Sequence, residues 1–350
     1  MRTVWRLLAR LLLVFGGLAA LLLAPVAYSE LACRPSGEPR AYQPILPPEH
    51  HRAESRTLMT YPEWHIVHAY EDYGRVLETG NPHDYGFFKG ISGFWGSLCA
   101  LSKASGQHGG VDSATKQMVY VIGVSFTAEL ALKAAYEETA GRIVAALRGS
   151  DRARLDELSA RQAQDYAVFL RQTPWYRWDF AADAQALDGA ATDSLRDWER
   201  ALALGLEYRA KAAYARAIAA AVAEVGPDAL TLRMIVSGIP AEALSQRDGI
   251  ILIGARNEGF EIETPRYRAL THLLQDLAAE GADFVEIAGN DEIMLTILSD
   301  EATRPDALSS QARQGFDDHR HLVLARVDAL ADILRDLNGS ADRLEHIHDY

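Results

Sequence analysis

The chain has 350 residues, of which 49% are hydrophobic and 24% are charged, so it is long and apolar enough to bury a sizeable core. Its 35 basic and 48 acidic residues leave a net charge of −13, which argues against the clustered positive surface that nucleic-acid binding requires. Two cysteines are too few for a disulfide scaffold or for a zinc site built from cysteine alone.

The first 29 residues are basic and then apolar. Three arginines within the first ten residues precede an uncharged stretch from Leu11 to Tyr28, LLLVFGGLAALLLAPVAY. With residues 7–10, this stretch reaches the roughly 20 residues that span a hydrocarbon core. The leading arginines predict a cytoplasmic N-terminus. We therefore expect residues 1–29 to be a single-pass anchor in the inner membrane with a periplasmic body; a cleaved signal peptide and a buried core helix are the alternatives.

Residues 30–57 contain five prolines and no apolar period. This composition predicts an extended tether between the anchor and the body. If the body is exported, Cys33 and Cys99 lie in an oxidising compartment, where a disulfide and two free thiols are both possible.

Helical periodicity dominates residues 58–226, the predicted helical domain. Glycine and proline pairs divide this region into segments and provide the helix stops, the last of them at Gly226-Pro227. Helices are expected over residues 60–78, 113–147, 151–172 and 192–224, with a segment rich in glycine and aromatic residues at 84–105.

The pattern changes over residues 227–300, where short segments rich in β-branched residues are bounded by turn residues. Strands are predicted at 230–236, 249–254, 260–263, 283–288 and 293–298, and helices at 240–245 and 265–280. The order β-α-β-β-α-β-β predicts a small ferredoxin-like α+β module with one added strand.

Residues 301–350 are expected to hold an amphipathic helix and an acidic, histidine-rich tail. An apolar seam with spacings of 4, 3, 4 and 3 runs through Val323, Val327, Leu330, Leu334 and Leu337. The seam either packs on the body or makes a homodimer or protein contact over 323–337. The terminal histidines are expected in solvent, unless the chain end folds back onto residues 61–95. The predicted fold is thus α+β and predominantly helical, with a transmembrane helix, a helical body, the small module and a C-terminal helix.

The segment from Tyr61 to Trp95 is the richest in candidate functional residues, since it holds nine of the thirty aromatic side chains. His65, His68 and Asp72 share one side of the predicted helix, beside Tyr61. Two imidazoles and a carboxylate can bind a divalent metal or relay a proton. They are the candidate metal ligands, with Tyr61 as a candidate catalytic residue; ordinary buried histidines bonded to backbone carbonyls are the alternative.

Glu129 is the second candidate catalytic residue. It follows twelve uncharged residues on an otherwise apolar face, and a buried carboxylate is costly unless it is paired or used. Lys133 lies four residues later, so an ion pair within the helix is the structural alternative.

Several catalytic motifs are absent from the sequence, among them the glycine-rich nucleotide loops, HExxH, CxxC and GxSxG. No nucleotide cofactor is therefore expected, and a divalent metal is the cofactor that the residues could hold. The sequence favours a membrane-anchored, periplasm-facing binding or interaction module. The alternative is a metal-dependent or acid/base enzyme that acts on an apolar or lipid-like substrate through His65, His68 and Asp72.

Overall fold

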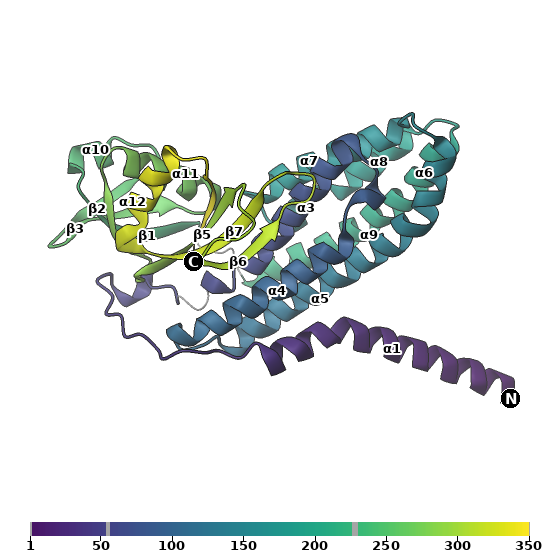
Figure 1. Cartoon of the computed structure of the whole chain (residues 1–350), viewed down its shortest axis with the longest axis horizontal. Coiled ribbons are helices and arrows are strands. Elements are labelled where there is room, and N and C mark those ends of the chain that lie inside the picture. Colours follow the sequence, from purple (N-terminus) through teal and green to yellow (C-terminus); the bar gives the residue numbers. More distant parts are fainter. Residues whose placement is uncertain (1, 54–56, 226–229, 350) are drawn as a thin grey trace.

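The structure is a computed structural model of the whole chain that describes residues 2–53, 57–225 and 230–349. It is 59% helical with two small antiparallel sheets, which confirms the predominantly helical α+β class. Figure 1 shows a helical lobe, formed by residues 57–225, beside a sheet lobe, formed by residues 230–349. The predicted helix stop at Gly226-Pro227 lies outside the described residues.

The N-terminal helix, α1 (Arg2–Ala32), extends beneath the helical lobe as a separate element (Figure 1). It continues through Pro25 and ends slightly beyond the predicted residue 29. Directly after it, Cys33 forms a disulfide with Cys99, so the two thiols are paired. Glu30 strengthens this attachment, because its carboxylate accepts a hydrogen bond from Tyr120 at 2.6 Å. The end of α1 is thus fixed to the helical lobe.

The helical lobe holds seven described α-helices. They are α3 (Tyr61–Thr79), α4 (Phe87–Ala104), α5 (Ser113–Tyr136), α6 (Arg142–Arg148), α7 (Arg154–Leu170), α8 (Phe180–Ala190) and α9 (Leu195–Val225). A π-helical turn, Glu137–Gly141, joins α5 to α6. Short 3₁₀ turns lie at Pro48–His50, Pro82–Asp84, Ser105–His108 and Trp175–Arg177. The prediction lacked α8, whose alanine-rich sequence carries little amphipathic pattern.

The core of the helical lobe lies between α3, α4, α5 and α7. The aromatic side chains of the segment 61–95 supply much of it, including Tyr73, Phe94 and Trp95. Gly123 on α5 faces two of these rings, and a Cβ atom there would lie 2.5 Å from Phe94 Cε1. The glycine therefore allows α5 to approach α4 closely, which most other residues would prevent.

The sheet lobe consists of two four-stranded sheets with the same order of strands. The first contains β1 (Thr231–Ser237), β2 (Ile251–Arg256), β3 (Gly259–Pro265) and β4 (Asp283–Ile287), in the order β2-β3-β1-β4. The second contains β5 (Glu292–Ser299), β6 (Ala307–Ala312), β7 (His319–Arg326) and β8 (Arg343–His348), in the order β6-β7-β5-β8. Their helices are α10 (Ala241–Ser245), α11 (Tyr267–Ala279) and α12 (Val327–Asn338). Because α11 packs on β8 and α12 packs on β4, both sheets share one core.

The C-terminal fifty residues differ from the prediction. Residues 301–350 form three strands as well as a helix, and Val323 belongs to β7 rather than to α12. The reason is that β5 is buried along its whole length and needs a hydrogen-bonded strand on each side, which β7 and β8 provide. Leu330 and Leu334 lie in the core of the same chain, so this part of the predicted seam packs on the body.

The proline-rich segment is not a free tether. Residues 34–53, here called the strap, first bond to the helical lobe, where the backbone N–H groups of Ser36 and Arg40 donate to the carbonyls of Lys103 and Gln107, and then pass along the sheet lobe. The buried carboxylate of Glu286 on β4 accepts hydrogen bonds from the Tyr42 hydroxyl (2.6 Å) and from the backbone N–H groups of Ile45 (2.6 Å) and Leu46 (2.8 Å). Three donors on one buried acid fix the strap in place, which corrects the prediction of an extended tether over residues 30–57.

Candidate functional site

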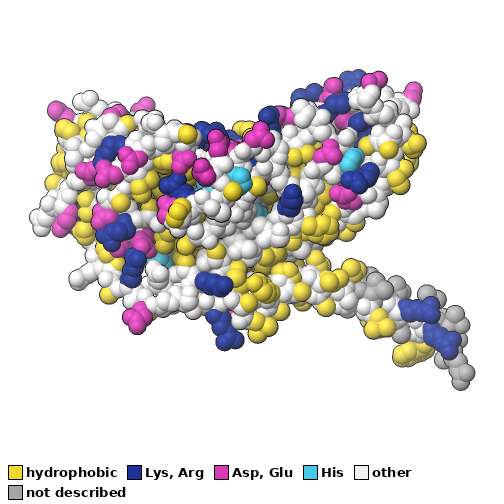
Figure 2. Space-filling model, in the orientation of Figure 1, with side chains coloured by type: hydrophobic (Ala, Val, Ile, Leu, Met, Phe, Trp, Pro, Cys, Tyr) yellow, Lys and Arg dark blue, Asp and Glu magenta, His cyan; other side chains and the backbone are white. Residues whose placement is uncertain are grey.

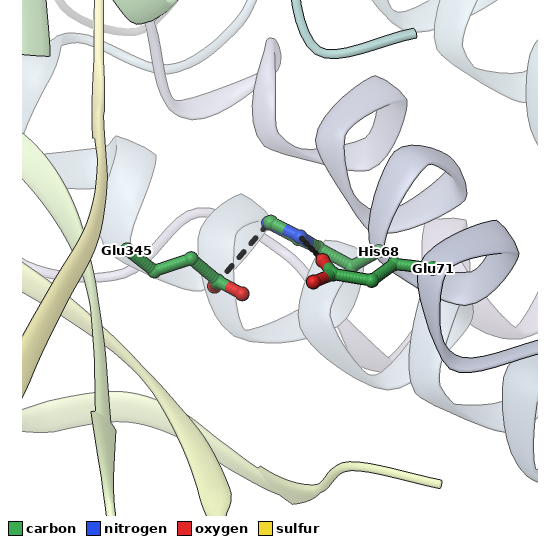
Figure 3. A group of neighbouring side chains, drawn as sticks. All are labelled: His68, Glu71 and Glu345. Carbon is green, nitrogen blue, oxygen red and sulfur yellow. Dashed lines mark ion pairs between the residues drawn. The ribbon is translucent and has the colours of Figure 1, made fainter. Parts of the chain in front are cut away.

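A cluster of ionisable side chains lies where α3 of the helical lobe meets β8 of the sheet lobe. His68 on α3 points between two carboxylates, those of Glu71 on the same helix and Glu345 on β8 (Figure 3). His68 Nε2 lies 3.6 Å from a Glu345 oxygen, and Nδ1 lies 4.0 Å from a Glu71 oxygen. One ligand atom from each residue falls within 4.8 Å of the other two, which is a spacing that could hold a metal ion.

The imidazole of His68 is buried, yet neither ring nitrogen has a hydrogen-bond partner among the described residues. Burial, aided by the positive charge of Arg320, lowers the pKa of His68 and so favours the neutral ring. A neutral imidazole offers a lone pair that can bind a metal.

Four arginines compensate the acids of this cluster. Arg320 binds both oxygens of Glu345, at 2.6 and 2.7 Å, and Arg313 binds Asp318 at 3.0 Å. Glu71 accepts hydrogen bonds from Arg171 at 2.7 Å and from Arg313 at 3.2 Å. The fourth cation, Arg343, also contacts Asp318.

These contacts determine the charge of the two carboxylates beside His68. Burial by itself would raise the pKa of Glu71, but His68 and the charge of Arg171 outweigh it and bring the pKa to about 2. Arg320 and His68 likewise overcome burial at Glu345 and hold the pKa of that carboxyl far below its usual range. Both groups are therefore ionised at neutral pH.

Two further histidines of β8 lie beside the cluster. The ring centroids of His346 and His348 are 4.9 Å apart, and those of Trp64 and His346 are 3.6 Å apart. His346 Nδ1 bonds to Thr271 at 3.0 Å, whereas His346 Nε2 and both nitrogens of His348 are buried without a hydrogen bond in the described part of the chain. Burial lowers the pKa of both rings well below the usual value, so they too remain neutral.

The structure separates the three residues that the sequence grouped as metal ligands. His68 lies in the cluster. His65 turns away from the cluster toward α4, where its Nε2 bonds to the backbone carbonyl of Gly90 at 2.9 Å. Asp72 lies at the edge of the cluster, where its carboxylate accepts a hydrogen bond from the Gln314 backbone at 2.9 Å. Burial raises the pKa of Asp72 to about 7, although Arg320 and this hydrogen bond oppose the change.

The two candidate catalytic residues lie in different places. The ring of Tyr61 is buried beside the cluster, with its centroid 5.3 Å from that of His348. Glu129 lies elsewhere in the helical lobe and pairs with Lys211 on α9 at 2.6 Å. Lys133 turns to Glu207 at 3.1 Å, so the predicted Glu129–Lys133 pair was wrong. Cross-helix partners replace it because both side chains face α9.

The sequence pattern did not single out Glu71 or Arg320, and it favoured a solvated chain end with His346 and His348. The alternative, in which the chain end folds back onto residues 61–95, is the one that the structure shows, since Glu345 and His346 lie against α3. Periodicity cannot bring a C-terminal strand to a helix almost 280 residues earlier. The signal that could have found them is the strand-like alternation in Arg343–His348, which puts Glu345 on one face and His346 and His348 on the other.

Comparison with known proteins gives no relative for this chain: no family model matches it, and no curated protein or solved structure is significantly similar. The function must therefore be argued from the chain's own geometry.

Proposed function

We propose that this chain is an exported, membrane-anchored binding protein whose ligand is a divalent transition-metal ion held by His68, Glu71 and Glu345. The observation that carries the proposal is the buried imidazole of His68, which lies between two ionised carboxylates with no hydrogen bond to either nitrogen. A buried polar group without a partner costs roughly 1–3 kcal/mol, so such a group calls for an explanation.

The spacing of the donors supports a metal as the missing partner. His68 Nε2 and the Glu345 oxygen are 3.6 Å apart, which is too long for a good hydrogen bond. Two ligands at about 2.1 Å from a tetrahedral zinc ion would lie roughly 3.4 Å apart. Arg320 would then act as the outer partner that orients the Glu345 carboxylate, whose oxygens each keep a second lone pair.

The charge balance favours ions that bind imidazole strongly. Four arginines already balance the four acids of the cluster, Glu71, Asp72, Asp318 and Glu345. A bound dication would therefore add positive charge that no acid of the cluster balances. Hard ions such as Mg²⁺ and Ca²⁺ rely on carboxylate charge, whereas Zn²⁺, Ni²⁺ and Cu²⁺ gain much of their affinity from nitrogen.

The anchoring part of the proposal rests on α1 and on the disulfide. The exposed leucines of α1 give it an apolar surface that water disfavours. Arginines at its start favour a cytoplasmic N-terminus in the inner membrane. The Cys33–Cys99 disulfide is typical of an oxidising compartment, which fits a periplasmic body.

The sheet lobe supports a more specific architecture, which we propose as two ferredoxin-like units in tandem. In each sheet the first strand lies between the third and the fourth, with the second at the edge. This is the strand order of a split β-α-β unit. The second unit lacks the helix between its first two strands and has a loop over residues 300–306 instead.

Metal analysis of the full chain, purified without a histidine tag and loaded with Zn²⁺, tests the binding site. We expect about one ion per chain after dialysis, and its loss in His68→Gln. Glu345→Gln should weaken binding at least tenfold, since one anionic ligand is lost.

The matched control is His65→Gln, which changes a buried histidine on the same helix that bonds to a backbone carbonyl. It should retain the ion. Failure of the wild-type chain to retain Zn²⁺, Ni²⁺ or Cu²⁺ would refute the metal site, and equal loss in His65→Gln and His68→Gln would assign the effect to folding.

A further inference from the structure

The helical lobe presents an unusual set of exposed side chains. Nine large apolar residues on α5, α6 and α9 have between 47 and 73% of their surface exposed. They are Met118, Val121, Leu132, Ile143, Leu147, Leu195, Trp198, Leu202 and Leu206. These nine residues are here called the apolar face. Figure 2 shows hydrophobic side chains gathered along the edge of the helical lobe that faces α1.

Several charges of the same helices point inward, whereas Arg142 on α6 and Arg209 on α9 are exposed and pair with Glu138 and Asp188. Glu137 and Arg200 are completely buried and pair at 2.6 Å between the π-helical turn after α5 and α9. Arg196 is also buried and binds Asp156 on α7 at 2.9 Å. On α9, the buried Arg196 and Arg200 thus alternate with the exposed Trp198 and Leu202.

Over residues 195–202 of α9, this arrangement is the reverse of that in a water-soluble bundle, where leucine faces the core and arginine faces solvent. In an apolar medium the preference inverts, because charged residues are tolerated there when they face the interior of a bundle and pair with one another. The apolar face therefore suits an environment of lipid.

The apolar face is continuous with the anchor. A groove with a volume of about 470 Å³ lies between α1 and α5, lined by Leu23 and Val26 on one side and by Val121 and Val124 on the other. Val121 belongs both to this groove and to the apolar face. Leu147 on α6 and Leu195 on α9 line a second groove together, so the exposed apolar residues of these two helices are neighbours on the surface.

The long helix that carries half of this surface has the composition of a membrane segment. Within the described residues, the continuous helix Ser113–Arg148 is long and apolar enough to cross a bilayer, and only a third of its most apolar stretch is buried. The apolar stretch of α1 in the described part of the chain, Gly16–Ala32, is shorter. The paired charges of the helix Ser113–Arg148 and its packing on α9 tie it to the lobe, so contact along one side explains its composition without a second crossing.

We infer that the apolar face docks on the bilayer that holds α1, so that the helical lobe lies partly immersed in the acyl region of the outer leaflet. This inference rests on the proposed anchoring of α1 and is independent of the metal site. Lipid is favoured over a protein partner because α1 lies directly beneath this side of the lobe (Figure 1). Acyl chains that surround α1 reach the face without displacing anything.

Trp198 provides a reporter inside the apolar face. The full chain is reconstituted in phosphatidylcholine vesicles whose acyl chains carry bromine, which quenches tryptophan on contact. We expect strong quenching of the wild-type chain and a clear loss of that quenching in Trp198→Phe. Trp175→Phe, a matched change in the same lobe away from the face, should retain it.

A second pair of variants tests the face without removing the reporter. Leu202→Glu should shift Trp198 emission to longer wavelength and reduce bromine quenching, because a charge one turn away disfavours immersion. Val168→Glu changes an equally exposed apolar residue on α7, outside the face, and should change neither.

The outcomes separate the inference from the anchoring on which it depends. Chains that do not float with the vesicles would refute the anchor. Chains that float while Trp198→Phe is quenched like the wild type would overturn the docking of the face. Unquenched Trp198 together with dimers that depend on Leu202 would also overturn it, and would assign the face to a second copy.

Discussion

His65 and His68 lie one turn apart on α3 and are both buried, yet they have different neighbours. The ring of His65 packs against Phe94 and Phe126 and bonds to the Gly90 carbonyl. Burial outweighs that hydrogen bond and lowers the pKa of His65 to about 3. His65 is therefore a structural residue, whereas His68 keeps both nitrogens available.

The lowered pKa of His65 predicts how stability depends on pH. The unfolded chain takes up a proton on this residue near pH 6.5, whereas the folded chain does so only near pH 3. The free energy of unfolding therefore has its full contribution from neutral His65 above pH 6.5 and loses it as the pH falls toward 3. The loss approaches about 1.4 kcal/mol per pH unit within this window.

Denaturant unfolding of the full chain in detergent, measured from pH 7.5 to pH 4.5, checks this prediction. His65→Gln keeps a donor for the Gly90 carbonyl but does not titrate, so its stability should fall less steeply on acidification than that of the wild type. Ser97→Ala removes a nearby buried hydrogen bond and no titrating group, so it should change stability without changing the slope. Parallel curves for His65→Gln and the wild type would contradict the assignment.

At this scale the sequence predicted part of the site. The helical period placed His68 and Asp72 on one face of α3, and the structure agrees. The same period could not separate His65 from them, because the choice depends on which neighbour lies against each ring. Glu71 was passed over because an acid on a helix with many charges carries no distinguishing pattern.

Among the elements, the helices followed from the sequence far better than the C-terminal strands did. The capping side chain of Asp112 and the break at Gly149 mark the limits of the long helix of α5 and α6. Val323 lies four residues before Val327 and so fits the apolar period of α12, although it belongs to β7. The local pattern therefore predicted a single helix where the structure has a strand followed by a helix. The pairing of β7 with β5 resolves the ambiguity, and it joins residues about 30 positions apart.

The disulfide is the covalent link between α1 and the helical lobe, and it predicts a measurable contribution to stability. Cys33 and Cys99 are 66 residues apart in the chain. Closing a loop of that length restricts the unfolded state and contributes roughly 4 kcal/mol in the chain-entropy model. We expect the double variant Cys33→Ser, Cys99→Ser to lose about 2–4 kcal/mol of its free energy of unfolding.

Reduction of the wild-type chain should reproduce this loss, which denaturant titration with and without dithiothreitol measures. A maleimide should label the oxidised chain at neither cysteine. If reduction exposes both thiols without changing the unfolding midpoint, the link does not stabilise the lobe.

The whole molecule is held together by contacts between segments that lie far apart in the sequence. The strap crosses from α1 to the sheet lobe, and α3 meets β8 through the charged cluster. The periodicity of the sequence predicts none of these contacts, because each one joins an acid to a group far away in the chain: the strap to Glu286, and His68 to Glu345. The sequence therefore predicted the classes of the parts, whereas their mutual arrangement depends on contacts between segments that are distant in the chain.

The strap and the disulfide together predict how the body is held to α1. Glu286→Gln replaces a carboxylate that accepts three hydrogen bonds with a group that carries its own donors, so the strap should open locally. Arg40 and Arg52 lie in the strap and are sites for trypsin, which needs an unfolded segment. Limited trypsin treatment of the full chain should therefore cut Glu286→Gln in the strap much faster than the wild type.

After that cut, the N-terminal fragment should stay with the body on a non-reducing gel and separate from it only after reduction, since Cys33 lies before both sites and remains bonded to Cys99. Glu263→Gln, which changes a partly buried acid on strand β3 of the same sheet, is the matched control and should leave the strap resistant. Equal cleavage in both variants would show that Glu286 does not hold the strap. Release of the fragment without reductant would show that the disulfide is not the second attachment. We expect Glu286 to protect the strap from trypsin and the disulfide to retain the N-terminal fragment. This result would show that the body is attached to α1 both through the strap and through the disulfide.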